Sequence, residues 1–86
     1  MNIILNCEKL KEREQAHEYL KKMLGLPEYY GGNLDALYDC LTELSGRTLV
    51  LLGAEALRED GGYGARILKV IEDAAASNSG LTLEIE

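Results

Sequence analysis

Acidic side chains recur at every fourth position in the middle of the sequence. Asp35, Asp39 and Glu43 lie in the segment 23–46, which contains no lysine or arginine. On a helix these residues stack on one face, where like charges at this spacing cost about 0.2 to 0.5 kcal/mol per pair. Stability alone would favour lysines among them, so the pattern predicts an exposed anionic surface that binds a cationic partner.

An ordinary solvated helix face is the alternative interpretation. It applies to Asp35, because the helix dipole favours an acid in the first turn, and the sequence leaves both explanations open for this residue. Asp39 and Glu43 lie beyond that turn, where the dipole gives them no comparable reason to be acidic. For Asp39 we therefore predict a role in binding.

A tyrosine-rich loop precedes the acidic positions. Tyr29 and Tyr30 are followed by Gly31 and Gly32, which let the backbone approach a partner closely. Amphipathic rings beside an acidic patch are typical of the residues that dominate protein–protein interfaces. We expect one ring to be buried and the other exposed. Loop and acidic face together would cover the active site of an enzyme that binds polyanions, with carboxylates in place of phosphates.

Alternation of strand-like and helical segments defines the expected fold. Three aliphatic runs, residues 3–7, 48–52 and 81–85, are separated by stretches with helical periodicity. This order predicts one α/β domain over residues 1–86, with a small three-stranded parallel sheet and about four helices. The first two runs are continuously apolar, as strands buried on both faces are, whereas the last alternates and should have one wet face. The order of the strands stays open.

The helix that carries the acids has recognisable ends. It should begin at Asn33, whose side chain can cap the free backbone donors, and end near Gly46. Its apolar face lies opposite the acids. We expect this helix to bury Leu34, Leu37, Leu41 and Leu44, with Thr42 on the acidic side and Tyr38 at the boundary.

The other helices follow from the same periodicity. The first should stop before Pro27, and a short one over residues 54–59 should end at Gly61. Residues 61–64 are expected to form a mobile turn. The first helix should bury Leu10, Ala16, His17, Leu20, Met23 and Leu24, and the last one Ile67, Leu68, Val70, Ile71, Ala74 and Ala75.

Composition excludes several classes of function. A formal net charge of −6 over 86 residues repels nucleic acid, and no apolar run is long enough to cross a membrane. Cys7 and Cys40 have no metal-ligand spacing and are expected to be free thiols in a reducing cytoplasm. We expect no cofactor, no metal, no leader peptide and a monomer when the protein is free.

One continuous motif carries a family resemblance. The stretch LPEYYGGNLDALYDCLT, residues 26–42, closely resembles the signature of the barstar family, whose members inhibit barnase-type ribonucleases. With weaker identity the resemblance extends over essentially the whole chain. It implies a three-stranded parallel sheet covered by helices. It also implies a cytoplasmic inhibitor that forms a 1:1 complex with a basic, extracellular-type ribonuclease and occludes its active site.

The resemblance also implies roles for individual residues. The acid at the place of Asp39 sits where substrate phosphate would bind, facing arginine and histidine, and Asp35 contacts the enzyme in a similar way. Tyr29 packs against the catalytic region, and Asp73 matches a peripheral acid of the family. The predicted partner-binding residues are Tyr29, Tyr30, Gly31, Asn33, Leu34, Asp35, Ala36, Tyr38, Asp39, Thr42, Glu43 and Asp73.

Two other classes of function stay open. The same acidic face could bind a basic protein that is not a nuclease. An enzyme would use Asp35 and Asp39 as a carboxylate pair or His17 as a base, but no nucleophile, oxyanion donor or metal set accompanies them. A satisfied, partly buried histidine is the better interpretation of His17. The chain departs from the resemblance at three positions. Tyr38 stands where the best-known member of the family has tryptophan, Leu44 replaces another aromatic residue, and Thr48 stands where a proline often precedes the second strand.

Overall fold

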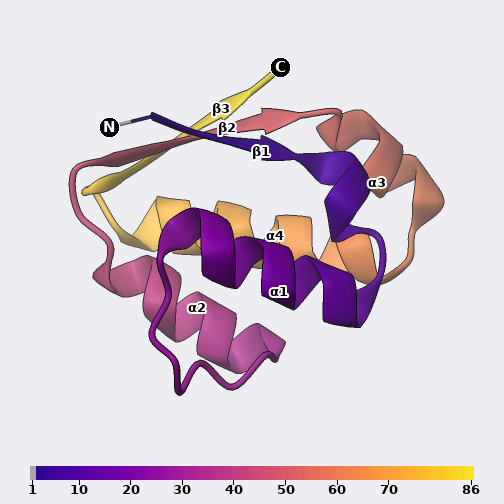
Figure 1. Cartoon of the computed structure of the whole chain (residues 1–86). Helices are drawn as coiled ribbons and strands as arrows, with labels where there is room; N and C mark the ends of the chain where they lie inside the picture. Colours follow the sequence, from indigo (N-terminus) through magenta and orange to yellow (C-terminus); the bar gives the residue numbers. More distant parts are fainter. Residues whose placement is uncertain (1) are drawn as a thin grey trace.

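The computed structural model describes residues 2–86 and places its three longest helices on one side of a small sheet (Figure 1). The strands β1 (Asn2–Asn6), β2 (Arg47–Leu52) and β3 (Leu81–Ile85) are parallel and lie in the order β1-β2-β3. The predicted α/β fold, with three parallel strands and four helices, is confirmed. The short 3-10 helix η1 spans Cys7–Leu10, and the α-helices are α1 (Arg13–Leu24), α2 (Leu34–Glu43), α3 (Ala54–Asp60) and α4 (Tyr63–Ser77).

The sheet is covered on one face. Ile3 of β1 pairs with Leu49 of β2, and both point into the core, where Leu49 is fully buried. On the opposite face, Ile4 is 55% exposed and Leu52 is 42% exposed. The prediction that β1 and β2 are buried on both faces is wrong, because α1, α2 and α4 all lie beneath the same face (Figure 1). The predicted wet face of β3 is present at Thr82 and Glu84.

Helix α1 ends earlier than expected. Its last residue is Leu24, and Gly25 follows in the left-handed conformation with φ of 64° while its N–H bonds the carbonyl of Lys21. Glycine adopts this conformation without steric cost, so Gly25 and not Pro27 stops the helix. Met23 is 38% exposed and does not belong to the buried stripe that we predicted.

Helix α2 begins as the sequence indicates. The Asn33 side chain accepts a hydrogen bond of 2.8 Å from the N–H of Ala36, which satisfies one free donor of the first turn. The helix ends at Glu43, before the predicted stop at Gly46. Of its predicted core residues, Leu37 and Leu41 are fully buried, whereas Leu34 and Leu44 are only half-buried.

A side chain from a distant turn closes the far end of α2. The amide of Asn78 donates to the carbonyl oxygens of Leu41 at 3.0 Å and Leu44 at 2.6 Å. Its own oxygen accepts a bond of 3.0 Å from the N–H of Gly80, at the entry to β3. Carbonyl groups at a helix end have no partner within the helix, so Asn78 supplies one and ties α2 to this turn.

The predicted mobile turn at residues 61–64 is wrong in its second half. Gly61 ends α3 in the left-handed conformation, as expected, but α4 already begins at Tyr63. Gly64 is buried, and a Cβ atom there would lie 2.9 Å from the carbonyl oxygen of Leu10. Glycine lets the start of α4 pack directly against η1, so this segment is a close helix contact.

Candidate partner-binding site

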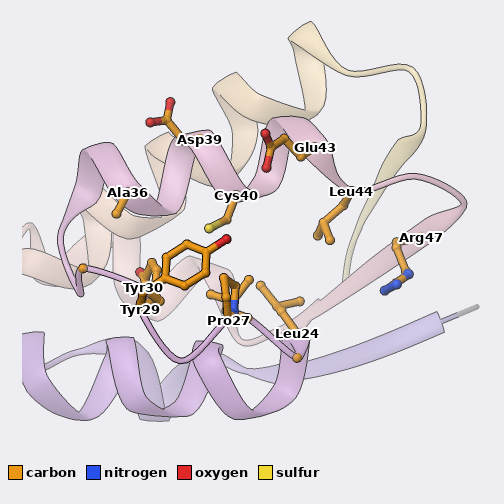
Figure 2. Close-up of a pocket in the computed structure, with 13 residues that line it drawn as sticks. Leu24, Pro27, Tyr29, Tyr30, Ala36, Asp39, Cys40, Glu43, Leu44 and Arg47 are labelled. Atoms are coloured by element: carbon orange, nitrogen blue, oxygen red, sulfur yellow. The ribbon is translucent and has the colours of Figure 1, made fainter.

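A groove of about 470 Å³ lies between the end of α1, the tyrosine loop and α2 (Figure 2). Leu24, Pro27 and Leu44 give it apolar walls, and Tyr30 also lines it. The predicted site residues that line it are Tyr29, Tyr30, Gly31, Ala36, Asp39 and Glu43. The remaining lining residues are Leu24, Gly25, Leu26, Pro27, Cys40, Leu44 and Arg47.

The groove is not uniformly acidic. Asp39 and Glu43 stand on its α2 side, and Arg47 stands at the start of β2 (Figure 2). We missed Arg47 because it follows directly after the segment without basic residues. It places one cation in the lining of the groove, apart from the two carboxylates, and limits the anionic rim to α2 (Figure 2).

The two tyrosines of the loop divide as predicted. Tyr29 is 88% exposed, the largest exposure among the large apolar side chains of residues 2–86, whereas Tyr30 is half-buried. Burial, and to a smaller extent Cys40 and Tyr63, raise the pKa of Tyr30 far above its ordinary value. Tyr29 is therefore free to contact a partner, while Tyr30 belongs to the support of the loop.

His17 holds that support in place. It is 5% exposed, its Nδ1 lies 2.6 Å from the hydroxyl of Tyr30, and its Nε2 lies 2.6 Å from the hydroxyl of Tyr63. A neutral imidazole donates through one nitrogen and accepts through the other, so both nitrogens are satisfied. Burial, together with the charge of Arg13, lowers the pKa of His17. The predicted satisfied histidine is confirmed, and it joins α1, the loop and α4.

The acids of α2 have no internal partners. Asp35, Asp39 and Glu43 are exposed, and none forms an ion pair with any residue between 2 and 86. Thr42 is half-buried, and its hydroxyl donates to the carbonyl oxygen of Asp39 at 2.9 Å. Asp73 differs from the acids of α2, because Lys69 on its own helix binds it at 3.2 Å.

A contact with α4 extends the surface of α2 sideways. The hydroxyl of Tyr38 donates to Ser77 Oγ at 3.2 Å. Asp73 lies one helical turn before Ser77 and therefore on the same side of α4. Asp73 thus adjoins the α2 surface at Tyr38. Asn33, Leu34 and Asp35 do not line the groove; they lie around a separate hollow at the start of α2.

Cys7 and Cys40 are free thiols, as predicted, and Cys40 is half-buried at the groove. Burial first, then Glu43 and Asp39, raise the pKa of the Cys40 thiol, so it is a poor nucleophile. Among residues 2–86, no three histidine, cysteine or acidic side chains gather as metal ligands, and no helix has the length and apolarity to span a membrane.

The fold and the site define a small α/β protein that presents an exposed acidic helix and an exposed tyrosine, the features of a protein-binding surface. A family model described as Barstar (barnase inhibitor) matches residues 1–86. A Bacillus subtilis (strain 168) protein named "Putative ribonuclease inhibitor YrdF" is 41% identical over 75 residues, which cover 84% of this chain and 82% of that protein. The chain belongs to the barstar family. Members of this family are inhibitors and not enzymes, so the enzyme hypothesis built on Asp35, Asp39 or His17 is rejected.

Proposed function

We propose that this protein is an intracellular, stoichiometric inhibitor of a basic, barnase-type ribonuclease. It forms a 1:1 complex and covers the active site of the enzyme with α2 and the loop before it. The observation that carries the proposal is the set of three exposed carboxylates on α2, none of which has a cationic partner among residues 2–86. A ribonuclease active site binds phosphates with cationic side chains, and carboxylates can take the same positions.

Two parts of the surface have different tasks in this proposal. The carboxylates attract the basic enzyme over distance, so association should slow as salt is added. Tyr29, which is almost fully exposed in the free protein, and Asp39 would become buried in the complex and would govern its dissociation. Asn33, Leu34, Ala36, Tyr38 and Thr42 contribute the surrounding contacts.

A titration tests the proposal. The purified protein is added to barnase while RNA cleavage is followed, at several salt concentrations, with Asp39→Ala beside the wild type. A sharp end point at equimolar protein, lost in the variant, would support occlusion centred on α2. If the wild type leaves cleavage unchanged at micromolar concentration, barnase is excluded as the target. Affinity capture from the producing cell then decides between another basic ribonuclease and a basic partner that is not a nuclease.

A further inference from the structure

A second hollow, of about 380 Å³, lies at the start of α2. Three helices contribute to it: Arg13 is the first residue of α1, and Arg66 lies in the first turn of α4. Tyr63 lies in the wall between these helices. The complete lining is Arg13, Asn33, Leu34, Asp35, Tyr63 and Arg66, so half of it belongs to the predicted partner-binding residues.

The charged side chains around this hollow form no ion pairs among residues 2–86. Arg13, Arg66 and Asp35 are all exposed, and none of them forms an ion pair within residues 2–86. Two guanidinium groups at one hollow repel each other, and the molecule has fifteen acidic residues against nine basic ones. An arrangement selected for stability alone would pair these arginines with acids, as happens at Arg58 and Glu72.

Helix geometry places Arg66 on the proposed partner-binding surface. Arg66 and Asp73 are seven residues apart on α4, which is two turns, so they share one side of the helix. Ser77 lies one turn further along that side and contacts Tyr38 of α2. Leu34, one turn before Tyr38, lines the hollow together with Arg66. The hollow therefore continues the surface of α2 beyond Asp35.

We propose, resting on the inhibitor function above, that this hollow receives a carboxylate side chain of the ribonuclease, bound by Arg66 and Arg13. The planar guanidinium group donates two parallel hydrogen bonds to a carboxylate, a geometry that lysine cannot offer. Asp35 stands at the same hollow and repels an acid placed on its own side, so the carboxylate is directed towards the arginines. Arg66 is the specificity-determining residue, because it shares its side of α4 with Asp73.

This assignment gives the surface a direction. At one end of the surface, Asp39 and Glu43 bind cationic groups of the enzyme. At the other end, Arg13 and Arg66 bind an anionic group. A partner with this charge order docks in one orientation. A basic ribonuclease without an acid at the matching position leaves two arginines facing its own cations, which disfavours the complex. The inhibitor would in this way discriminate among enzymes that share a basic active site.

The test compares two arginines in the complex with a ribonuclease that the wild-type protein inhibits. Arg66→Ala and the control Arg58→Ala remove the same charge, so long-range attraction changes equally. Arg58 lies on α3 and forms an ion pair of 2.8 Å with Glu72. Loss of a charge-assisted contact costs about 1.5 kcal/mol or more, so Arg66→Ala should raise the dissociation rate constant about tenfold. Arg58→Ala should leave it unchanged.

Two further measurements identify the contact. Arg66→Glu should raise the dissociation rate constant more than Arg66→Ala. Double-mutant cycles with alanine at each acidic surface residue of the enzyme should find one acid that couples to Arg66. Equal dissociation rates for Arg66→Ala, Arg58→Ala and the wild type, with inhibition intact, would overturn the proposal alone. Absence of inhibition by the wild type against every ribonuclease would overturn the inhibitor function and this proposal with it.

Discussion

Helices α2 and α4 lie side by side beneath the sheet, yet they treat their acidic residues in opposite ways. In α4, Glu72 binds Arg58 at 2.8 Å and Asp73 binds Lys69 at 3.2 Å. In α2, none of the three acids has a cationic partner within residues 2–86. Both helices bury an apolar face, so the difference does not come from packing. The acids Glu72 and Asp73 of α4 are paired within the molecule, whereas those of α2 are left available to a partner.

Helix α2 is held by neutral interactions instead. Leu37 and Leu41 are fully buried, Asn33 caps the first turn, and Asn78 binds the last carbonyl groups. This arrangement fixes the position of the helix without using its charges. It follows that substitutions of the acids should affect binding, and substitutions of the caps should affect stability first.

The largest effect is expected when Asp39 is replaced, and it is a loss of affinity for the ribonuclease. Removal of one partner of a buried interfacial charge pair costs about 2 to 5 kcal/mol, and the barnase–barstar pair is itself the standard example of such coupling. Asp39→Ala should therefore raise the dissociation constant of the ribonuclease complex by at least about thirtyfold. Its free energy of unfolding should not fall, because the wild-type carboxylate has no internal cation to lose. Titration calorimetry and urea unfolding measure the two quantities.

Glu59→Ala is the matched control for Asp39→Ala. Glu59 is an exposed acid on α3, away from the loop and α2, and its removal changes the net charge equally. It should leave the dissociation constant nearly unchanged. Equal losses of affinity in the two variants would mean that net charge, and not the α2 surface, determines binding.

The largest expected effect on stability is at Asn78. Asn78→Ala leaves the carbonyl groups of Leu41 and Leu44 without their side-chain donor. The Asn78 side chain also accepts from the N–H of Gly80, so three hydrogen bonds of about 1 kcal/mol each are lost, and the free energy of unfolding should fall by about 3 kcal/mol. Ser79→Ala, at the exposed neighbouring position, is the control and should change little. Chemical unfolding measures both, and an unchanged stability of Asn78→Ala would show that solvent replaces this cap.

A smaller loss is expected where α4 meets the tyrosine loop. Tyr63→Phe removes the hydrogen-bond partner of His17 Nε2 and leaves a buried polar atom unsatisfied. The free energy of unfolding should fall by about 1 to 1.5 kcal/mol. Tyr19→Phe, which removes a hydroxyl that accepts from the exposed backbone N–H of Asn6, should cost less. Equal losses would indicate that His17 finds another partner.

His17 also gives this region a pH dependence of known sign. Its pKa in the fold is lower than the ordinary 6.5, so the unfolded chain takes up the proton first as the pH falls. The stability from His17 is complete above pH 6.5 and decreases below it, until the pKa of the folded state is passed. His17→Gln should flatten the dependence of the unfolding free energy on pH in this range. A slope that persists in this variant would assign the titration to other groups.

The sequence predicted those features that depend on neighbouring residues. Asn33 was recognised as the start of α2 because its capping bond reaches only three residues along the chain. Leu37 and Leu41 were placed in the core, and the acids on the opposite side, because helical periodicity fixes relative directions. The aliphatic runs predict the strands of the sheet, but they do not predict that one face of β1 and β2 is exposed to solvent. An apolar run has the same appearance whether one or both of its faces are covered.

Features that join distant residues could not be predicted in this way. Asn78 binds the carbonyl groups of Leu44 and Leu41, which precede it by 34 and by 37 positions in the chain. His17 binds Tyr63 across 46 positions. Arg66 belongs to the hollow only because α4 lies beside α2, so an interpretation centred on the acidic helix missed it. Glycine at position 64 is the signal for close packing there, but a glycine-rich run predicts a mobile turn equally well.

The smallest effects are expected from two substitutions, one that gives an acid of α2 a cationic partner and one that removes the cationic partner of an acid in α4. Glu43→Lys places a cation four residues after Asp39 and near the end of α2, so it should stabilise the protein by about 0.5 kcal/mol. It should nevertheless weaken inhibition, because it adds a positive charge to the surface that meets a basic enzyme. Lys69→Glu makes the opposite change in α4 and should destabilise by a similar amount, since the Lys69–Asp73 pair is largely exposed. Lower stability of Glu43→Lys would mean that Glu43 stabilises the fold, as the paired acids of α4 do. Intact inhibition by this variant would mean that Glu43 does not contribute to the binding of the enzyme.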